Sequence, residues 1–97
     1  MAKVEKQVQD VIERAVRNEF AGASLVRLDV SRDQDFDGDS IFNIFVVLND
    51  EFRPRPTSLT DLIRNIRSHL GHIDEAAFPM VRVVTKRDSQ AILNGSR

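Results

Sequence analysis

The chain has 97 residues, 41% hydrophobic and 30% charged, the proportions of an ordinary globular protein, so we expect one domain over residues 1–97. Its net charge of −1 provides no overall positive field for nucleic acid, and its lack of cysteine excludes disulfides, thiolate zinc sites and cysteine nucleophiles. No apolar run reaches the ~20 residues of a membrane span, and charges stand where a signal peptide is apolar, so we expect a cytoplasmic protein without a membrane partner.

The first predicted element is an amphipathic helix over residues 3–20. Its apolar residues are spaced by three and four, the period of one helical face. They are Val4, Val8, Val11, Ile12, Ala15, Val16 and Phe20. At about 100° per residue they cover close to half of the circumference, more than contact with one sheet requires. We therefore expect part of this face, including Val16 and Phe20, to contact a partner.

Two β-strands are predicted next, over residues 24–33 and 41–48. The first alternates between apolar and polar residues, as in a strand with one face in water. The second reads IFNIFVVL and is apolar on both faces. This pattern predicts a central strand that is buried on both sides.

A loop and a second helix follow. The two prolines in residues 49–58 end the sheet pattern, because proline has no amide hydrogen to donate to a neighbouring strand. Ser58 followed by Asp61 resembles a capping box at the start of a helix. Its apolar positions continue to Ile73, and Gly71 marks its end.

A third strand is predicted over residues 80–86, directly after Pro79, and residues 89–97 form either a last helical turn or a frayed tail. The fold class is therefore α+β, in the order α-β-β-α-β, with a small three-stranded sheet and two helices on one face. Such a sheet leaves two edges and one uncovered face. We therefore expect a homo-oligomer or another protein as partner.

The acidic segment DQDFDGDS, residues 33–40, lies between the first two strands. Asp37-Gly38 between two strand patterns favours a two-residue hairpin turn, in which both central residues have positive φ. In that register Val30 faces Phe45. This interpretation needs no cofactor.

The alternative for the same segment is a magnesium or calcium site. Its ligands would be the four alternating aspartates, because crowded carboxylates repel one another unless solvent or a cation compensates. They are Asp33, Asp35, Asp37 and Asp39. The segment begins like a helix-loop-helix calcium loop, but the twelfth position is Ile44 instead of glutamate. Any cation site here would therefore be of another kind.

The order of elements resembles a minimal nucleotidyltransferase domain over residues 3–86. Such domains have a Gly-Ser pair after the first strand, two metal-binding aspartates one residue apart on the second strand, and often an acid on the third. The corresponding segments are Val30-Ser31-Arg32, Asp39-Ser40-Ile41-Phe42-Asn43 and Val81-Arg82-Val83, which lack the glycine, the acid pair and the acid. Nucleotidyl transfer needs carboxylates that hold metal ions, so the resemblance implies lost catalysis. Some such domains pair with bacterial RNase-type toxins, which implies an antitoxin or adaptor by analogy.

The expected function is that of a small non-enzymatic interaction protein that binds itself or another protein. Two aromatic residues outside the predicted core, Phe36 and Phe52, are candidate interface residues. The alternative is a divalent-metal-dependent nucleotide-binding domain or enzyme that uses the aspartates of residues 33–39. Nucleic acid is not an expected partner, because the polar face of the first strand carries Asp29 and Asp33, which repel phosphate.

Overall fold

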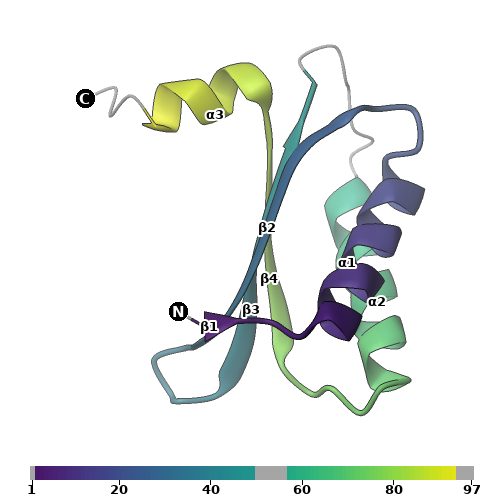
Figure 1. Cartoon of the computed structure of the whole chain (residues 1–97), viewed down its shortest axis with the longest axis vertical. Helices are drawn as coiled ribbons and strands as arrows, with labels where there is room; N and C mark the ends of the chain where they lie inside the picture. Colours follow the sequence, from purple (N-terminus) through teal and green to yellow (C-terminus); the bar gives the residue numbers. More distant parts are fainter. Residues whose placement is uncertain (1, 50–56, 94–97) are drawn as a thin grey trace.

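Residues 2–49 and 57–93 are described by the computed structural model (Figure 1). The predicted α+β class is confirmed, with α1 and α2 on one face of the sheet, and the structure adds a two-residue strand and a third helix. The elements are β1 (Ala2–Lys3), α1 (Lys6–Glu19), β2 (Leu25–Gln34), β3 (Ser40–Leu48), α2 (Ser58–Gly71), β4 (Phe78–Thr85) and α3 (Lys86–Leu93). Most of the predicted proline loop, with Phe52, lies outside the described residues.

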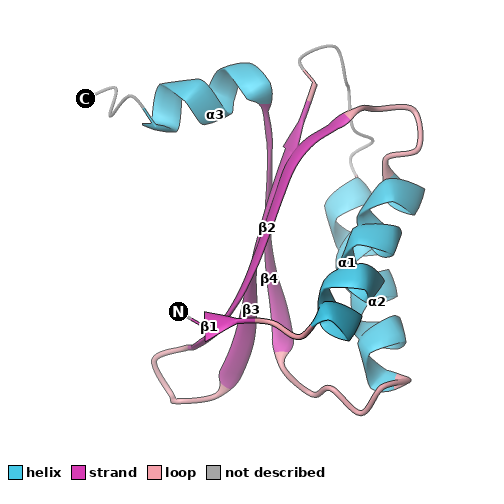
Figure 2. Cartoon of the chain, viewed as in Figure 1, coloured by secondary structure: helices cyan, strands magenta, loops and turns pink. Residues whose placement is uncertain are grey.

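The strands form one sheet, which Figure 2 shows edge-on beside the helices. Their order in the sheet is β1-β2-β3-β4. Neighbouring strands are antiparallel except β3 and β4, which are parallel. Helix α2 connects these two strands, and a crossover of this kind is what parallel neighbours need. Strand β3 is therefore central, as its apolar sequence predicts.

The core lies between the sheet and the helices α1 and α2. Alternate residues of β3 point into it, and their side chains are at most 2% exposed: Phe42, Ile44, Val46 and Leu48. On the opposite face of β3, Val47 is buried, whereas Phe45 is only half-buried. The prediction of burial on both sides therefore holds at one end of the strand alone.

The broad apolar face of α1 is covered within the chain. Helix α2 packs along α1 and provides the second surface that the wide face needs. Val16 is 0% and Phe20 is 3% exposed, and both belong to the core. The predicted interface role of these two residues is corrected, because neither has surface to offer a partner.

The register of the β2–β3 hairpin differs from the predicted one by one residue. Val30 pairs with Ile44 instead of Phe45. Because side chains alternate between the faces of a sheet, a shift of one residue changes which side chains share a face. The observed register places Val30 beside the buried Ile44 and leaves Phe45 on the opposite face.

The hairpin turn also differs from the predicted two-residue turn. The amide of Asp35 donates to the carbonyl of Asp39 at 3.0 Å, so three residues form the loop, and the amide of Gly38 donates back to the carbonyl of Asp35 at 3.0 Å. Gly38 has φ 84°, which a residue with a side chain rarely adopts. A tight turn followed by a positive-φ glycine is the common three-residue hairpin loop. Only the glycine therefore has positive φ here, and Asp37 does not.

Two boundaries near α2 and β4 were predicted wrongly. The residue that caps the start of α2 is Thr57, without a side-chain capping bond, while Ser58 is buried in the first turn, so the capping box is not formed. Strand β4 begins at Phe78 and includes Pro79, which an edge strand tolerates because one side needs no amide donor. Of the alternatives for the C-terminal segment, the helical one is confirmed as far as Leu93.

Candidate functional site

The sheet face opposite α1 and α2, here called the outer face, carries an open groove of about 550 Å³. Helix α3 lies on this side of the sheet, at one end (Figure 1). The lining residues all come from β2, β3 and β4. They are Arg27, Asp29, Ser31, Asn43, Ile44, Phe45, Met80, Val81 and Arg82. The solvent-facing side predicted for the first strand is therefore one part of a groove that three strands form.

The middle of the outer face is apolar and its sides are charged. Phe45 is half-buried, and Met80 on the neighbouring strand is 50% exposed. On one side, Arg27 Nε lies 2.6 Å from Asp29 Oδ2. On the other side, Arg82 has no ion-pair partner among residues 2–49 and 57–93. The face therefore combines exposed apolar area with an acid-base pair on β2 and an arginine on β4.

Three of the four predicted metal-binding aspartates lie together at the tip of the hairpin. Carboxylate oxygens of Asp35, Asp37 and Asp39 lie within 4.8 Å of one another, and all three residues are exposed. Asp33 is not one of them. Its oxygens accept hydrogen bonds from the amide of Gln34 at 2.8 Å and from Asn43 Nδ2 at 3.2 Å.

The hairpin loop itself uses one of these carboxylates. Asp35 Oδ1 accepts hydrogen bonds from the backbone amides of Asp37 and Asp39, both at 2.9 Å. This side chain thus holds the loop closed, as aspartate commonly does in turns. Phe36 at the tip is fully exposed, as expected of a candidate interface residue, and its role at an interface stays a prediction.

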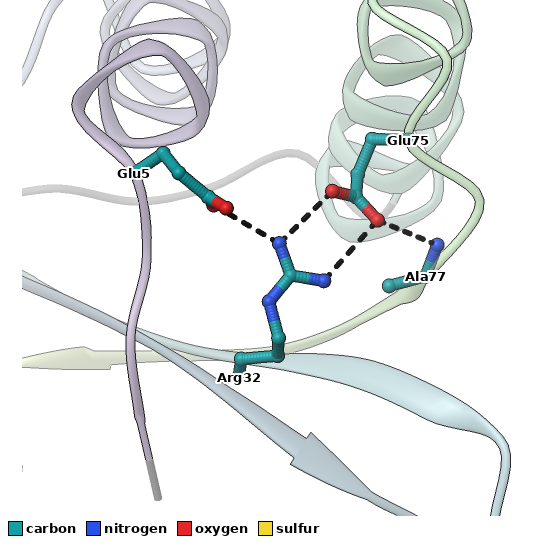
Figure 3. Close-up of polar contacts among 4 residues, drawn as sticks. All are labelled: Glu5, Arg32, Glu75 and Ala77. Atoms are coloured by element: carbon teal, nitrogen blue, oxygen red, sulfur yellow. Dashed lines mark hydrogen bonds and ion pairs between the residues drawn. The ribbon is translucent and has the colours of Figure 1, made fainter.

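A third polar cluster lies on the core side of the sheet and is centred on Arg32 (Figure 3). Its Nη2 donates to Glu75 Oε1 at 2.9 Å and to Glu5 Oε1 at 3.1 Å, and its Nη1 donates to Glu75 Oε2 at 3.3 Å. The guanidinium also lies 4.7 Å from the centre of the Phe42 ring. Arg32 therefore ties the segment before α1 and the segment after α2 to the end of β2.

The backbone after α2 positions Glu75 for this contact. Its amide donates to the carbonyl of Leu70 at 2.9 Å, and the amide of Asp74 donates to the carbonyl of Gly71 at 3.2 Å. Asp74 has φ 59°, the left-handed conformation that ends many helices. Beyond this turn, Glu75 Oε2 accepts a hydrogen bond from the amide of Ala77 at 3.4 Å, which restrains the carboxylate further.

The Arg32 cluster changes the titration of its members. The pKa of Glu75 is lowered, first by the hydrogen bond from Arg32, and the pKa of Arg32 is raised, first by the same bond. The pKa of Glu5 is lowered by a backbone hydrogen bond and then by Arg32. Sequence reasoning missed this cluster. The available signal was the alternation of β2, which places Arg32 on the apolar side with Val30.

The segments that resemble nucleotidyltransferase motifs lie on adjacent strands. Ser31 pairs with Asn43 across β2 and β3, and Arg82 lies on β4 beside them. The carboxylate that lines the groove, Asp29, is paired with Arg27. No family model, curated protein or solved structure matches the chain. The resemblance therefore stays a prediction.

Among the described residues, no helix combines the length and apolar character needed to span a membrane.

Proposed function

We propose that the chain is a non-enzymatic protein-interaction domain that binds a protein through the groove on the outer face of its sheet. The observation that carries this proposal is the exposed apolar area of the groove, where Phe45 on β3 is half-buried and Met80 on β4 is 50% exposed. An apolar centre with charged residues at its sides is the usual composition of a protein interface. The core-facing sides of α1 and α2 are covered by the chain's own packing, whereas Met80 on the outer face is half-exposed.

A pair of matched variants tests this proposal. Met80→Asp places a charge on β4 in the lining of the groove, and Leu59→Asp places the same charge on α2, at a side chain that is 44% exposed. We expect Met80→Asp to lower the recovery of bound protein from the native cell at least about tenfold, because an unpaired charge would be buried in the interface. Leu59→Asp should bind as the unmodified chain does.

Affinity capture with the three baits, followed by quantitative mass spectrometry, gives the measurement. If the tagged chain recovers untagged copies of the same chain, this self-association also counts as binding of a protein. Circular dichroism confirms that the variants are folded. Equal recovery by Met80→Asp and the unmodified chain would contradict the proposed surface.

A second candidate function is divalent-cation binding at the hairpin tip. The convergence of the Asp35, Asp37 and Asp39 oxygens favours it, since magnesium and calcium take carboxylate oxygens as ligands. If a cation binds there, millimolar calcium, magnesium or manganese should raise the unfolding temperature, because a ligand that binds only the folded state stabilises it. Asp37→Asn should abolish this shift, whereas Asp33→Asn, outside the cluster, should keep it. No shift with any of the three ions would reject this candidate.

A further inference from the structure

One row across the outer face carries an acid, an aromatic ring and a base. Asp29 on β2 pairs with Phe45 on β3, and Phe45 pairs with Arg82 on β4. All three residues line the groove. With strands spaced by about 4.8 Å, Asp29 and Arg82 lie on opposite sides of the ring, with roughly 10 Å between their backbones. The row therefore has a negative end and a positive end.

We propose that the protein bound in the groove is a second copy of this chain, related to the first by a two-fold axis parallel to β3 that passes beside Phe45. This inference rests on the proposed binding role of the outer face. A two-fold rotation about that axis exchanges the two ends of the row, so Asp29 of each copy lies opposite Arg82 of the other. The two Phe45 rings meet at the centre. In a symmetric dimer each contact occurs twice, so the row supplies two ion pairs.

The charges favour a two-fold axis parallel to the strands over a two-fold axis across them. An axis that lies across the strands would place Asp29 opposite Asp29 and Arg82 opposite Arg82, and facing like charges are unfavourable in an interface. Sheets that pack face to face prefer nearly aligned strands, which the proposed axis also provides. The arrangement therefore satisfies both the charges and the geometry of sheet packing.

Both charged groups are able to form these contacts. Arg82 is exposed and has no ion-pair partner in the described parts of the chain. Asp29 is held by Arg27 through Oδ2, and its side chain is 52% exposed. Its other oxygen can accept a hydrogen bond from a second guanidinium, since a carboxylate has about four acceptor sites.

The dimensions of the face indicate a weak dimer. Three strands of about eight residues cover roughly 14 × 26 Å, at spacings of about 4.8 Å between strands and 3.3 Å along them. This flat area, about 360 Å², is less than half of the roughly 800 Å² per partner that is standard for specific interfaces. We therefore expect a micromolar dissociation constant, so the test requires concentrations up to several hundred micromolar.

Charge inversion at both ends of the row gives the test, by sedimentation equilibrium of the full chain. Asp29→Lys makes both ends of the row positive, and Arg82→Glu makes both ends negative. Each variant alone should dimerise at least about tenfold more weakly than the unmodified chain, because each dimer would face two like-charge contacts. An equimolar mixture should restore the dimer, because Lys stands opposite Glu and Arg opposite Asp in the mixed pair. Arg64→Glu on α2, a residue whose side chain is 68% exposed, is the control and should dimerise normally.

The outcomes separate this inference from the proposed function. A monomer at all concentrations, or single variants that dimerise like the unmodified chain, would overturn the second copy as the partner. Failure of the mixture to dimerise would overturn the two-fold pairing of Asp29 with Arg82. If the chain is a monomer while Met80→Asp still loses a captured protein, the outer face binds a different protein and only this inference fails. If Met80→Asp captures as well as the unmodified chain, the proposed function itself fails.

Discussion

Phe42→Ala is expected to lower the free energy of unfolding by about 3–5 kcal/mol, the usual cost of deleting a fully buried phenylalanine side chain. Phe42 is 0% exposed in the central strand and belongs to the core between the sheet and the helices. Its ring also lies beneath the guanidinium of Arg32. Because small domains are stable by only about 5–15 kcal/mol, this substitution should remove a large part of the total.

Urea unfolding followed by circular dichroism provides the measurement for Phe42. The control is Phe36→Ala, which removes the same side chain from the fully exposed tip of the hairpin. Its effect on unfolding should stay within about 0.5 kcal/mol, as for most surface substitutions. Similar losses in the two variants would contradict the core position of Phe42.

Arg32→Met should lower the free energy of unfolding by about 2 kcal/mol, within the range for hydrogen bonds to charged groups. Methionine keeps apolar contact with Phe42 but removes both donors to Glu75. The Glu75 side chain is only 20% exposed, so its carboxylate would lose its charged partner in a place that water reaches poorly. The control is Arg64→Met, which breaks the exposed pair with Asp61 and should cost less than about 0.5 kcal/mol.

The pH dependence of unfolding distinguishes the ion pair from simple packing by Arg32. Because the pKa of Glu75 is lowered from its ordinary value of 4.5, the stability from this pair is fully present above that value. It is lost as the pH falls through the lower pKa of the folded state, where Glu75 becomes protonated. The difference between the unmodified chain and Arg32→Met should therefore shrink between pH 7 and pH 3. A difference that is the same at both pH values would show that Arg32 acts through packing alone.

The candidate sites differ in how far the sequence reveals them. The aspartates at the hairpin tip are neighbours in the chain, so their proximity is predictable, although the part played by Asp35 in closing the loop is not. The groove is harder to predict from the sequence, because three strands form it. Asp29, Phe45 and Arg82 lie in one row only in the observed strand register. Arg32 and Glu75 are 43 positions apart, and no local pattern connects them.

The sequence by itself determined the order of the main helices and strands and the central place of β3, because apolar periodicity and proline positions act over a few neighbouring residues. The tertiary structure alone decided the register of the hairpin and the burial of Val16 and Phe20 in the core. Both outcomes depend on contacts between residues that are far apart in the sequence. A one-residue shift or a second helix changes the neighbours of every side chain without changing the local pattern.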